Sequence, residues 1–408
     1  MYRFLVTASI LVLLGFVYLG QRLIAEIWSK NLQLALWLIL GAMIANLLWL
    51  PFKRWRRQMA ARPNPQSETV ARYLEASAYN LMGLLSLLLL FCVLSDVLRL
   101  IFRVLPQSLQ GDILVAIPAG QNLDSILAIA VMVVAVLFFT WGRVTVARGP
   151  RFRYVNVVFP LHGKPRRRPR FRGHKALPKK IRIAQVSDLH IGRAIKKPYV
   201  ARVVEMLNSQ NADIVCFTGD IGDGNIEHLF EDSAPLAEIK SSHGTYYIPG
   251  NHEYYWAMQK WLNAFKLHGF KPVINRGEII KTDAGSIFLA GVSDPTAARF
   301  AEELPKIPDV QPADVSILLA HQPIFARSAA QKKYDMMLSG HTHGGQYIPW
   351  SWVVHLVYRF ASGLYRSGKM LVYVNDGTGY WGAPVRIGTR LEITILDIYL
   401  NSEDISRT

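Results

Sequence analysis

Four long apolar runs fill much of the first third of the chain, at residues 4–20, 32–51, 79–98 and 123–142. Each approaches the ~20 residues that an α-helix needs to cross the hydrocarbon core of a membrane. The first run also resembles a signal peptide, but its apolar stretch is long and no small-residue cleavage site is evident before the second run. The pattern therefore predicts a four-helix transmembrane anchor over residues 1–142.

Basic residues alternate along this region and predict its orientation. The first and third loops hold few of them, whereas the second loop holds Lys53, Arg54, Arg56, Arg57, Arg62 and Arg72, and many more follow the fourth run. Loops rich in Lys and Arg stay on the cytoplasmic side of a membrane. We therefore expect a multi-pass protein of the cytoplasmic (inner) membrane, with both termini and the C-terminal domain inside the cell.

One ionisable residue stands out in these runs: Asp96, near the end of the third run and one turn before Arg99. An ionisable group in a spanning segment points to function, but here an interfacial ion pair with Arg99 is the simpler interpretation. No other charge lies deep in the four runs, which leaves little from which to build a transport path. We interpret the helices as an anchor.

Residues 143–180 are predicted to be a basic juxtamembrane linker, with an Arg triplet at 166–168 and five prolines that argue against a regular helix. Such a segment is solvated, or it attaches to anionic headgroups at about 1 kcal/mol per basic residue near the surface. Nucleic acid is not an expected partner, because Phe152, Tyr154 and Phe171 have no recognised binding fold around them.

From residue 181 the pattern changes to short β-branched runs that end in polar, glycine-bearing turns. Five such runs occupy 181–186, 213–217, 244–248, 315–320 and 334–338. The turns after them contain, in order, Asp188 and His190, Asp220 and Asp223, Asn251 and His252, His321, and finally His341 and His343. Loops at strand ends converge while their scaffold stays rigid, so we expect these side chains to form one site.

The residue types in this set indicate two metal ions. Imidazole and carboxylate ligands without thiolate suit Mn, Fe and Zn better than Ca or Mg. Two such ions about 3.5–4 Å apart clamp a phosphoryl group, and a metal-bound water with a pKa near 7 supplies hydroxide at neutral pH. A lone His is a weak signal, whereas five strand ends with these residues in this order would rarely arise in an unrelated fold.

The composition indicates which class of partner the protein binds. The 408 residues carry a formal net charge of +17, with 51% hydrophobic and only 18% charged residues. An excess of Lys and Arg indicates an anionic partner, and its position beside the apolar runs favours the lipid bilayer and an anionic phosphoester substrate. The 2 cysteines, Cys92 and Cys216, lie in apolar stretches. They support no disulfide framework, and we expect both to be buried structural residues.

Residues 181–398 resemble the calcineurin-like metallophosphoesterase family in all of these motif blocks. The resemblance implies an α/β fold, a four-layer αββα sandwich of two mixed sheets with a dinuclear site between them, for a catalytic domain at 181–400. It implies Asp188, His190 and His343 as ligands of the first metal, Asn251, His321 and His341 as ligands of the second, and Asp220 as the bridge. It also implies His252 as the general acid near the leaving group and Asp223 as the residue that orients it. The complete set predicts an active enzyme.

More narrowly, GHTHGGQ at 340–346 and YVNDGTGYWGAPVRIG at 373–388 look like a membrane-associated bacterial branch of the family. That branch is compared with a phosphodiesterase of bacilli and resembles lipid-linked UDP-diacylglucosamine pyrophosphatases. Here Gly379, Tyr380 and Trp381 replace the small residues that are usual near the tail. The resemblance implies hydrolysis of a phosphodiester or pyrophosphate bond.

The expected substrate is a membrane lipid or lipid-linked compound, because tethering keeps the site close to the bilayer. The aromatic stretch 347–365 is either an interfacial element that admits an acyl chain or a loop and helix packed on the core. Two alternatives stay open: an anchored phosphodiesterase or phosphatase for a soluble substrate, and a membrane sensor or scaffold without catalysis. The complete ligand set argues against the second.

Overall fold

The structure is a computed structural model that describes residues 2–25, 30–58, 65–115, 117, 122–160, 166–167, 180–300 and 302–401. The chain divides into two compact units. One, the helical unit, comprises Met1–Thr145 together with Gly382–Ile387. The other, the sandwich unit, comprises Val146–Trp381 and Gly388–Thr408.

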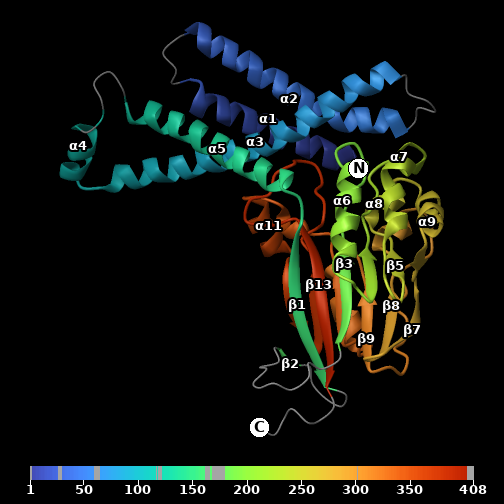
Figure 1. Cartoon of the computed structure of the whole chain (residues 1–408). Helices are drawn as coiled ribbons and strands as arrows, with labels where there is room; N and C mark the ends of the chain where they lie inside the picture. The colour runs from blue at the N-terminus through green and yellow to red at the C-terminus, as the bar shows by residue number, and fades with distance from the viewer. Residues whose placement is uncertain are drawn as a thin grey trace. The chain divides into compact units, whose positions relative to one another are not determined.

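The described part of the helical unit is built from α1 (Tyr2–Leu23), α2 (Lys30–Gln58), α3 (Pro65–Val104), α4 (Gln107–Val115) and α5 (Leu123–Ala147) (Figure 1). Each predicted apolar run lies in one of the helices α1, α2, α3 and α5. Among the described residues, Tyr73–Val104 and Leu123–Ala147 are long and apolar enough to cross a membrane, whereas the apolar parts Ile10–Leu23 and Gln33–Leu48 are shorter. Two candidate spans are therefore supported, and the four-span anchor stays a prediction.

Asp96 forms the predicted ion pair with Arg99 and also contacts Arg22 and Tyr18. Arg99 Nη1 lies 2.8 Å from Asp96 Oδ1, and Arg22 Nε lies 3.2 Å from the same oxygen. The Tyr18 hydroxyl donates to Asp96 Oδ2 at 2.7 Å, while Arg99 Nε reaches Asp124 Oδ1 at 2.6 Å. These contacts join α1, α3 and α5, and they pair two basic groups with two acidic ones. The group is a structural link between helices.

Two mixed sheets form the described part of the sandwich unit. The first has seven strands in the order β2-β1-β13-β3-β4-β5-β6: β2 (Arg166–Arg167), β1 (Arg151–Pro160), β13 (Glu392–Asn401), β3 (Lys180–Val186), β4 (Ile214–Thr218), β5 (Thr245–Ile248) and β6 (Phe270–Pro272). The second has six strands in the order β11-β12-β10-β9-β8-β7: β11 (Gly363–Ser367), β12 (Met370–Val374), β10 (Met336–Ser339), β9 (Val315–Leu319), β8 (Gly285–Gly291) and β7 (Arg276–Thr282). All five predicted strands are present, as β3, β4, β5, β9 and β10.

Helices flank the strands: α6 (Lys197–Asn208), α7 (Ile226–Ser233), α8 (Asn251–Tyr255), α9 (Met258–Leu267), α10 (Ala326–Gln331) and α11 (Trp350–Val357). Short 3₁₀ turns lie at η1 (Ala234–Glu238), η2 (Pro295–Arg299), η3 (Pro323–Phe325) and η4 (His343–Gly345). In α6 the buried residues Val200, Val203, Val204 and Leu207 recur with helical spacing, which gives that helix one apolar face.

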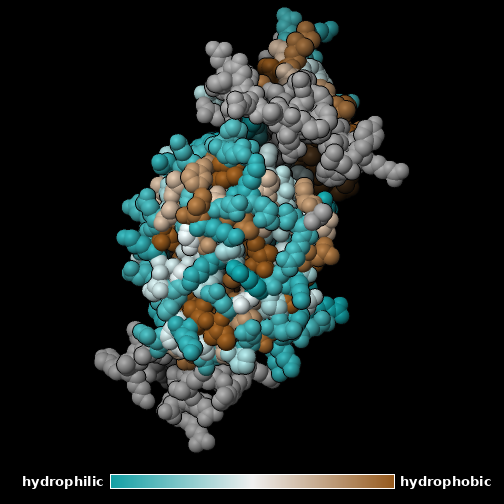
Figure 2. Space-filling model, turned by 90° about the vertical axis from the view of Figure 1, so that its right-hand side faces the viewer, coloured by the Kyte–Doolittle hydropathy of each residue, from teal (hydrophilic) through white to brown (hydrophobic). Residues whose placement is uncertain are grey.

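Apolar side chains fill the space between the two sheets, where Ile183 and Cys216 of the first belong to one core with Ile317 and Leu338 of the second. Trp261 of α9 belongs to a second core, on the outer face of the first sheet. A third core joins α10 to the outer face of the second sheet. The unit is therefore a mixed α/β sandwich with two sheets. Figure 2 shows hydrophilic residues over most of its visible face, which is typical of a surface in water.

The start of the sandwich differs from the sequence-based prediction. Residues 151–160, placed in the predicted linker 143–180, form β1, which pairs in parallel with β13 from Arg151 opposite Glu392 to Pro160 opposite Asn401. The run is rich in aromatic and β-branched residues, which favour a strand, but the flanking prolines and basic residues led to its assignment to the linker. Its distant partner β13 leaves no local signal. Of the same predicted linker, 161–165 and 168–179 lie outside the described residues, as does Arg62 of the second loop. Both cysteines are free and buried, as predicted.

Candidate metal centre

The predicted site residues follow the carboxyl ends of β3, β4, β5, β9 and β10. In the first sheet β3, β4 and β5 are parallel, and in the second β9 and β10 are parallel, so each group of loops emerges at one edge. Gln185 of β3 links the sheets just below these loops, because its Nε2 donates to Ser339 O of β10 and to Thr218 Oγ1 of β4, both at 2.9 Å. The site therefore straddles the two sheets.

Asp188, His190 and His343 form the first group, and their nearest ligand atoms all lie within 4.8 Å of one another. His190 Nε2 faces His343 Nε2 at 3.1 Å, and His343 Nε2 lies 3.3 Å from Asp188 Oδ1. All three side chains are buried.

Asp220, His321 and His341 form the second group, again within 4.8 Å. The ring of His321 is oriented by its Nδ1, which lies 2.7 Å from Thr218 O, so that Nε2 points to Asp220 Oδ2 at 3.2 Å. Asp220 also forms a close group with His190 and His252, and so lies between the two sets. Asn251 is the first residue of α8 and is buried. It directly precedes His252, whose backbone N–H donates to Asp220 Oδ1 at 2.8 Å.

The arrangement fits two divalent cations. Two imidazole nitrogens 3.1 Å apart, as in His190 and His343, need a proton or a cation between their lone pairs. The buried Asn251 Oδ1 has no hydrogen-bond partner, although a buried polar atom without a partner costs about 1–3 kcal/mol. A metal ion satisfies such atoms, and imidazole, carboxylate and amide groups are the ligand types that divalent metals use.

Backbone conformation concentrates strain at the site. Asp188, His190, Asp220, His341 and His343 all have positive φ, between 51° and 71°. A left-handed residue other than glycine costs of order 1–3 kcal/mol and persists where the surrounding structure imposes it. Gly250 permits the close packing, because a Cβ there would overlap the Asp220 carboxylate and backbone. The fold thus holds five side chains in a geometry that their backbones do not favour.

His252 and Asp223 form a pair beside this cluster. His252 Nδ1 lies 3.0 Å from Asp223 Oδ1, and the same oxygen accepts a hydrogen bond from Trp256 Nε1 at 2.9 Å. The Nε2 atom of His252 is directed to the cluster, 3.9 Å from Asp220 Oδ2. Asp223 therefore orients the ring and leaves Nε2 available for proton transfer.

Electrostatics distinguish the histidines. Burial lowers the pKa of His252, but the carboxylates of Asp220 and Asp223 outweigh it and raise that pKa to about 9. Burial, with the charge of His252 beside it, lowers the pKa of His190 to about 3. Burial likewise lowers the pKa of His341 to about 4. Two histidines are thus held neutral, as metal ligands must be. At His321 burial also lowers the pKa, but the Asp220 carboxylate outweighs it and raises that pKa well above its ordinary value, as it does at His252.

The N-terminal part of the sandwich also matches a family model. Residues 181–345 match the model of the calcineurin-like phosphoesterases. An uncharacterised metallophosphoesterase of Aquifex aeolicus is 32% identical over 233 residues, which cover 54% of this chain and 87% of that protein. The chain belongs to the calcineurin-like metallophosphoesterase family. It is therefore a hydrolase of the metallophosphoesterase type.

Two other relatives show how far the likeness extends. A metallophosphoesterase of Helicobacter pylori (strain J99) is 38% identical over 226 residues, and the match covers only 60% of its length. A transmembrane protein with metallophosphoesterase domain from Danio rerio is 28% identical over 419 residues, covering 96% of this chain and 88% of that protein. The transmembrane relative and the two candidate spans together indicate a membrane-associated metallophosphoesterase.

The structure reveals a residue that sequence reasoning missed. Glu253 is fully buried, and its carboxylate accepts the backbone N–H groups of Asp220, Ile221, Gly222 and Gly250 at 2.7–3.0 Å. It ties the loop after β4 to the loop after β5. Its place directly after Asn251 and His252 was visible in the sequence, but its partners are backbone groups, which leave no pattern of side-chain types.

Residues 379–381 of the tail motif lie against the metallophosphoesterase site. Gly379 N donates to Asp188 O at 3.0 Å. Gln346, the last residue of GHTHGGQ, holds the backbone of Trp381 on both sides: its Nε2 donates to Trp381 O at 2.7 Å and its Oε1 accepts from Trp381 N at 3.1 Å. The two motifs that defined the narrower resemblance therefore bind each other.

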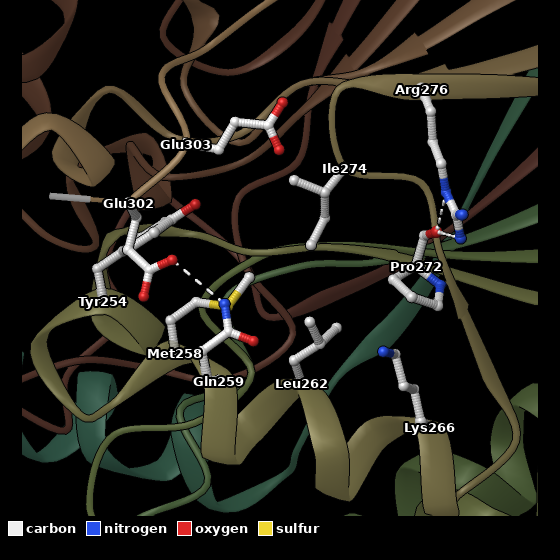
Figure 3. A pocket seen from close by; sticks show the side chains of 10 residues that line it. All are labelled: Tyr254, Met258, Gln259, Leu262, Lys266, Pro272, Ile274, Arg276, Glu302 and Glu303. Atoms are coloured by element: carbon white, nitrogen blue, oxygen red, sulfur yellow. Dashed lines mark hydrogen bonds between the residues drawn. The ribbon is translucent and has the colours of Figure 1, made fainter. Parts of the chain in front are cut away.

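A second hollow, of about 260 Å³, is lined by Tyr254, Met258, Gln259, Leu262, Lys266, Pro272, Ile274, Arg276, Glu302 and Glu303 (Figure 3). None of the nine predicted site residues lines it. Its two basic and two acidic side chains offset each other, and Gln259 Nε2 donates to Glu302 Oε2 at 3.2 Å. Such a surface offers little attraction for a phosphate, so the metal centre remains the candidate active site.

Proposed function

We propose that the protein hydrolyses a phosphodiester or pyrophosphate bond of a membrane lipid or lipid-linked substrate, with Mn, Fe or Zn as its two ions. The proposal rests on one observation above all: six of the seven predicted ligands fall into overlapping His and Asp groups that come from separate loops, and the His252–Asp223 pair lies beside them. A scaffold or sensor would have no need of an oriented acid beside a complete ligand set.

In this proposal Asp188, His190 and His343 would hold one ion, Asn251, His321 and His341 would hold the other, and Asp220 would serve both. When bound, the ions offset the negative charge of the phosphoryl group and acidify the attacking water. His252 gives its Nε2 proton to the leaving oxygen as the P–O bond breaks. Asp223 keeps the ring in place and stabilises its charged form, because the carboxylate lies 3.0 Å from Nδ1.

Helix α11 supports a lipid substrate. Leu356 is 88% exposed, Val357 69% and Trp352 57%, whereas Tyr347 before the helix and Phe360 after it are buried. The stretch 347–365 therefore combines both readings of its sequence: its ends pack on the core and its middle presents apolar surface. The region from Met336 to Asn375 contains no Asp or Glu, and Arg359, Arg366 and Lys369 are exposed. An apolar helix with basic neighbours suits the surface of an anionic bilayer.

The same helix is fastened to the metal loop at both ends. A Cβ at Gly345 would overlap the backbone of Ser351, and the ring of Tyr358 meets the ring of His341 with centroids 6.2 Å apart. A bilayer that contacts α11 therefore lies near the candidate ligands, which gives a lipid phosphate a short path to them.

The soluble-substrate alternative is tested on the full-length protein in detergent, loaded with Mn²⁺. We expect turnover of bis-p-nitrophenyl phosphate, and faster turnover of vesicle-borne lipid phosphodiesters or pyrophosphates than of cyclic nucleotides at equal concentration. Preference for the cyclic nucleotides would favour the soluble-substrate enzyme, and a metal-loaded protein inactive on every phosphoester would favour the scaffold.

We further propose that the protein is a multi-pass protein of the cytoplasmic membrane with its sandwich unit in the cytoplasm, on the basis of the basic second loop. Reporter fusions after Thr408 test this. Activity of an alkaline phosphatase fusion, which requires export, would place the unit on the other side.

A further inference from the structure

Three aromatic side chains form an exposed wall beside His252. The ring of Tyr255 lies 5.5 Å from the His252 ring at 61°, and the ring of Trp381 lies 5.8 Å away at 75°. Phe300 extends the wall, because its ring lies 6.1 Å from that of Tyr255. Tyr255 and Trp381 are each 40% exposed and Phe300 is 47% exposed.

The wall is assembled from three distant segments of the chain. Tyr255 ends α8, the short helix that begins with Asn251, and Phe300 caps η2. Trp381 is fixed through its backbone, which Gln346 binds on both sides, and Gly379 before it has no room for a Cβ against Leu189. The side chain of Trp381 itself is therefore not needed to hold the loop, which makes its exposure at the site informative.

Exposed aromatic rings are costly in water and favourable against apolar ligand groups, because each ring buries a large area when it is covered. Here the rings of Tyr255 and Trp381 adjoin His252, the proposed donor to the leaving oxygen, whereas α11 approaches the site at His341, through Tyr358. The wall is thus placed to contact the leaving group and not the group that remains bound to phosphorus.

We propose that Tyr255, Phe300 and Trp381 form an apolar leaving-group subsite, which takes an alkyl or aryl group attached to the leaving oxygen. This inference rests on the proposed function and names the chemistry on one side of the scissile bond. Water attacks phosphorus and releases one proton to solvent, the P–O bond breaks, and the leaving alcohol or phenol takes a proton from His252, which solvent then restores. The apolar group of the leaving alcohol or phenol stays on the wall.

The test uses two matched series of phosphodiesters with the full-length, Mn²⁺-loaded protein. In the first, methyl 4-alkylphenyl phosphates, the para-alkyl group grows from hydrogen to butyl on the leaving phenol and barely alters its acidity. In the second, alkyl phenyl phosphates, the same chains grow on the retained side. We expect kcat/KM to rise about two- to four-fold per methylene in the first series, and much less in the second.

The variants Trp381→Ala and Trp381→Phe separate recognition from folding. Trp381→Ala should abolish the rise of kcat/KM with alkyl chain length in the first series and leave the dependence on chain length in the second series unchanged. Trp381→Phe should restore most of the rise in the first series. Phe230→Ala removes an aromatic ring that is 42% exposed on α7 and stacked on His268, and should alter neither slope. A merely structural role of Trp381 would lower both series alike.

The outcomes distinguish the two proposals. Turnover of both series with no chain-length response in the first, or with an equal response in wild type and Trp381→Ala, overturns the subsite and leaves the phosphodiesterase intact. Absence of turnover in both series by protein that contains both metals overturns the proposed function and the subsite with it.

Discussion

Glu253 holds Asp220 from behind: its Oε2 accepts the backbone N–H of Asp220 at 3.0 Å, while the Asp220 carboxylate faces the histidines. The same Glu253 carboxylate binds three further N–H groups of the two adjoining loops. Asp220 has a φ of 54°, a conformation it does not favour alone. The proposed bridging ligand thus depends on a neighbour outside the predicted ligand set.

Glu253→Gln should therefore weaken metal binding without removing a ligand. An amide NH₂ would face backbone donors, and a buried donor left without an acceptor costs about 1–3 kcal/mol. We expect a lower melting temperature and a loss of bound metal that excess Mn²⁺ partly restores. Asp314→Asn is the matched control, because Asp314 accepts the N–H and hydroxyl of Ser286 on β8, away from the site. Normal metal content in Glu253→Gln would contradict this role.

Asp220→Ala and His252→Ala should separate metal binding from proton transfer. Asp220 adjoins both ligand groups, so its removal should lower metal content and rate together. His252→Ala should keep metal content near normal while kcat falls by about 10²–10⁴-fold, the usual contribution of a general acid. Metal analysis beside initial rates measures both. If His252→Ala loses its metals, His252 is a ligand and not the acid.

Asp397 provides a prediction for acid stability. Although burial raises its pKa, hydrogen bonds from Arg182 and Lys180, with Arg182 Nε at 2.7 Å, lower that pKa overall. A carboxyl with a lowered folded-state pKa adds stability above its unfolded value of about 3.9, and this is lost as pH falls through the folded value. The contact joins β13 to β3 in register.

Asp397→Asn should thus lower the melting temperature of the sandwich unit at pH 7. Below pH about 4 the melting temperature of the variant should fall less steeply with decreasing pH than that of the wild type. Thermal unfolding followed by tryptophan fluorescence across that range measures it. Glu227→Gln removes the exposed pair with Lys260 and should change little, because exposed ion pairs contribute little. An unchanged acid profile in Asp397→Asn would show that other carboxyls control it.

The sequence predicted the part of the site that depends on residue type and strand ends. Asp188, Asp220 and His321 each follow a β-branched run, and the parallel strands within each sheet bring the loops to one edge. What escaped prediction depends on contacts between distant segments. Strand β1 is recognised by its pairing with β13, Glu253 by backbone donors, and the wall at Trp381 by rings from three loops. The distant partners in these contacts leave no local pattern.

Helix α11 carries the last prediction, which concerns access from the membrane. Trp352 and Leu356 lie four residues apart and are 57% and 88% exposed, so they share one face of the helix. If that face enters the bilayer, the double substitution Trp352→Asp and Leu356→Asp places two charges there and removes two apolar anchors, each worth about 1.5–3 kcal/mol when fully buried. Turnover of a vesicle-borne phosphodiester should then fall at least about ten-fold, while turnover of bis-p-nitrophenyl phosphate stays near normal.

Leu267→Asp, at a residue 76% exposed on α9, is the control and should affect the turnover of neither substrate. Equal losses on both substrates would mean that α11 supports the metal loop and not the membrane contact. No loss on either substrate would favour the alternative, an anchored enzyme that acts on a soluble substrate.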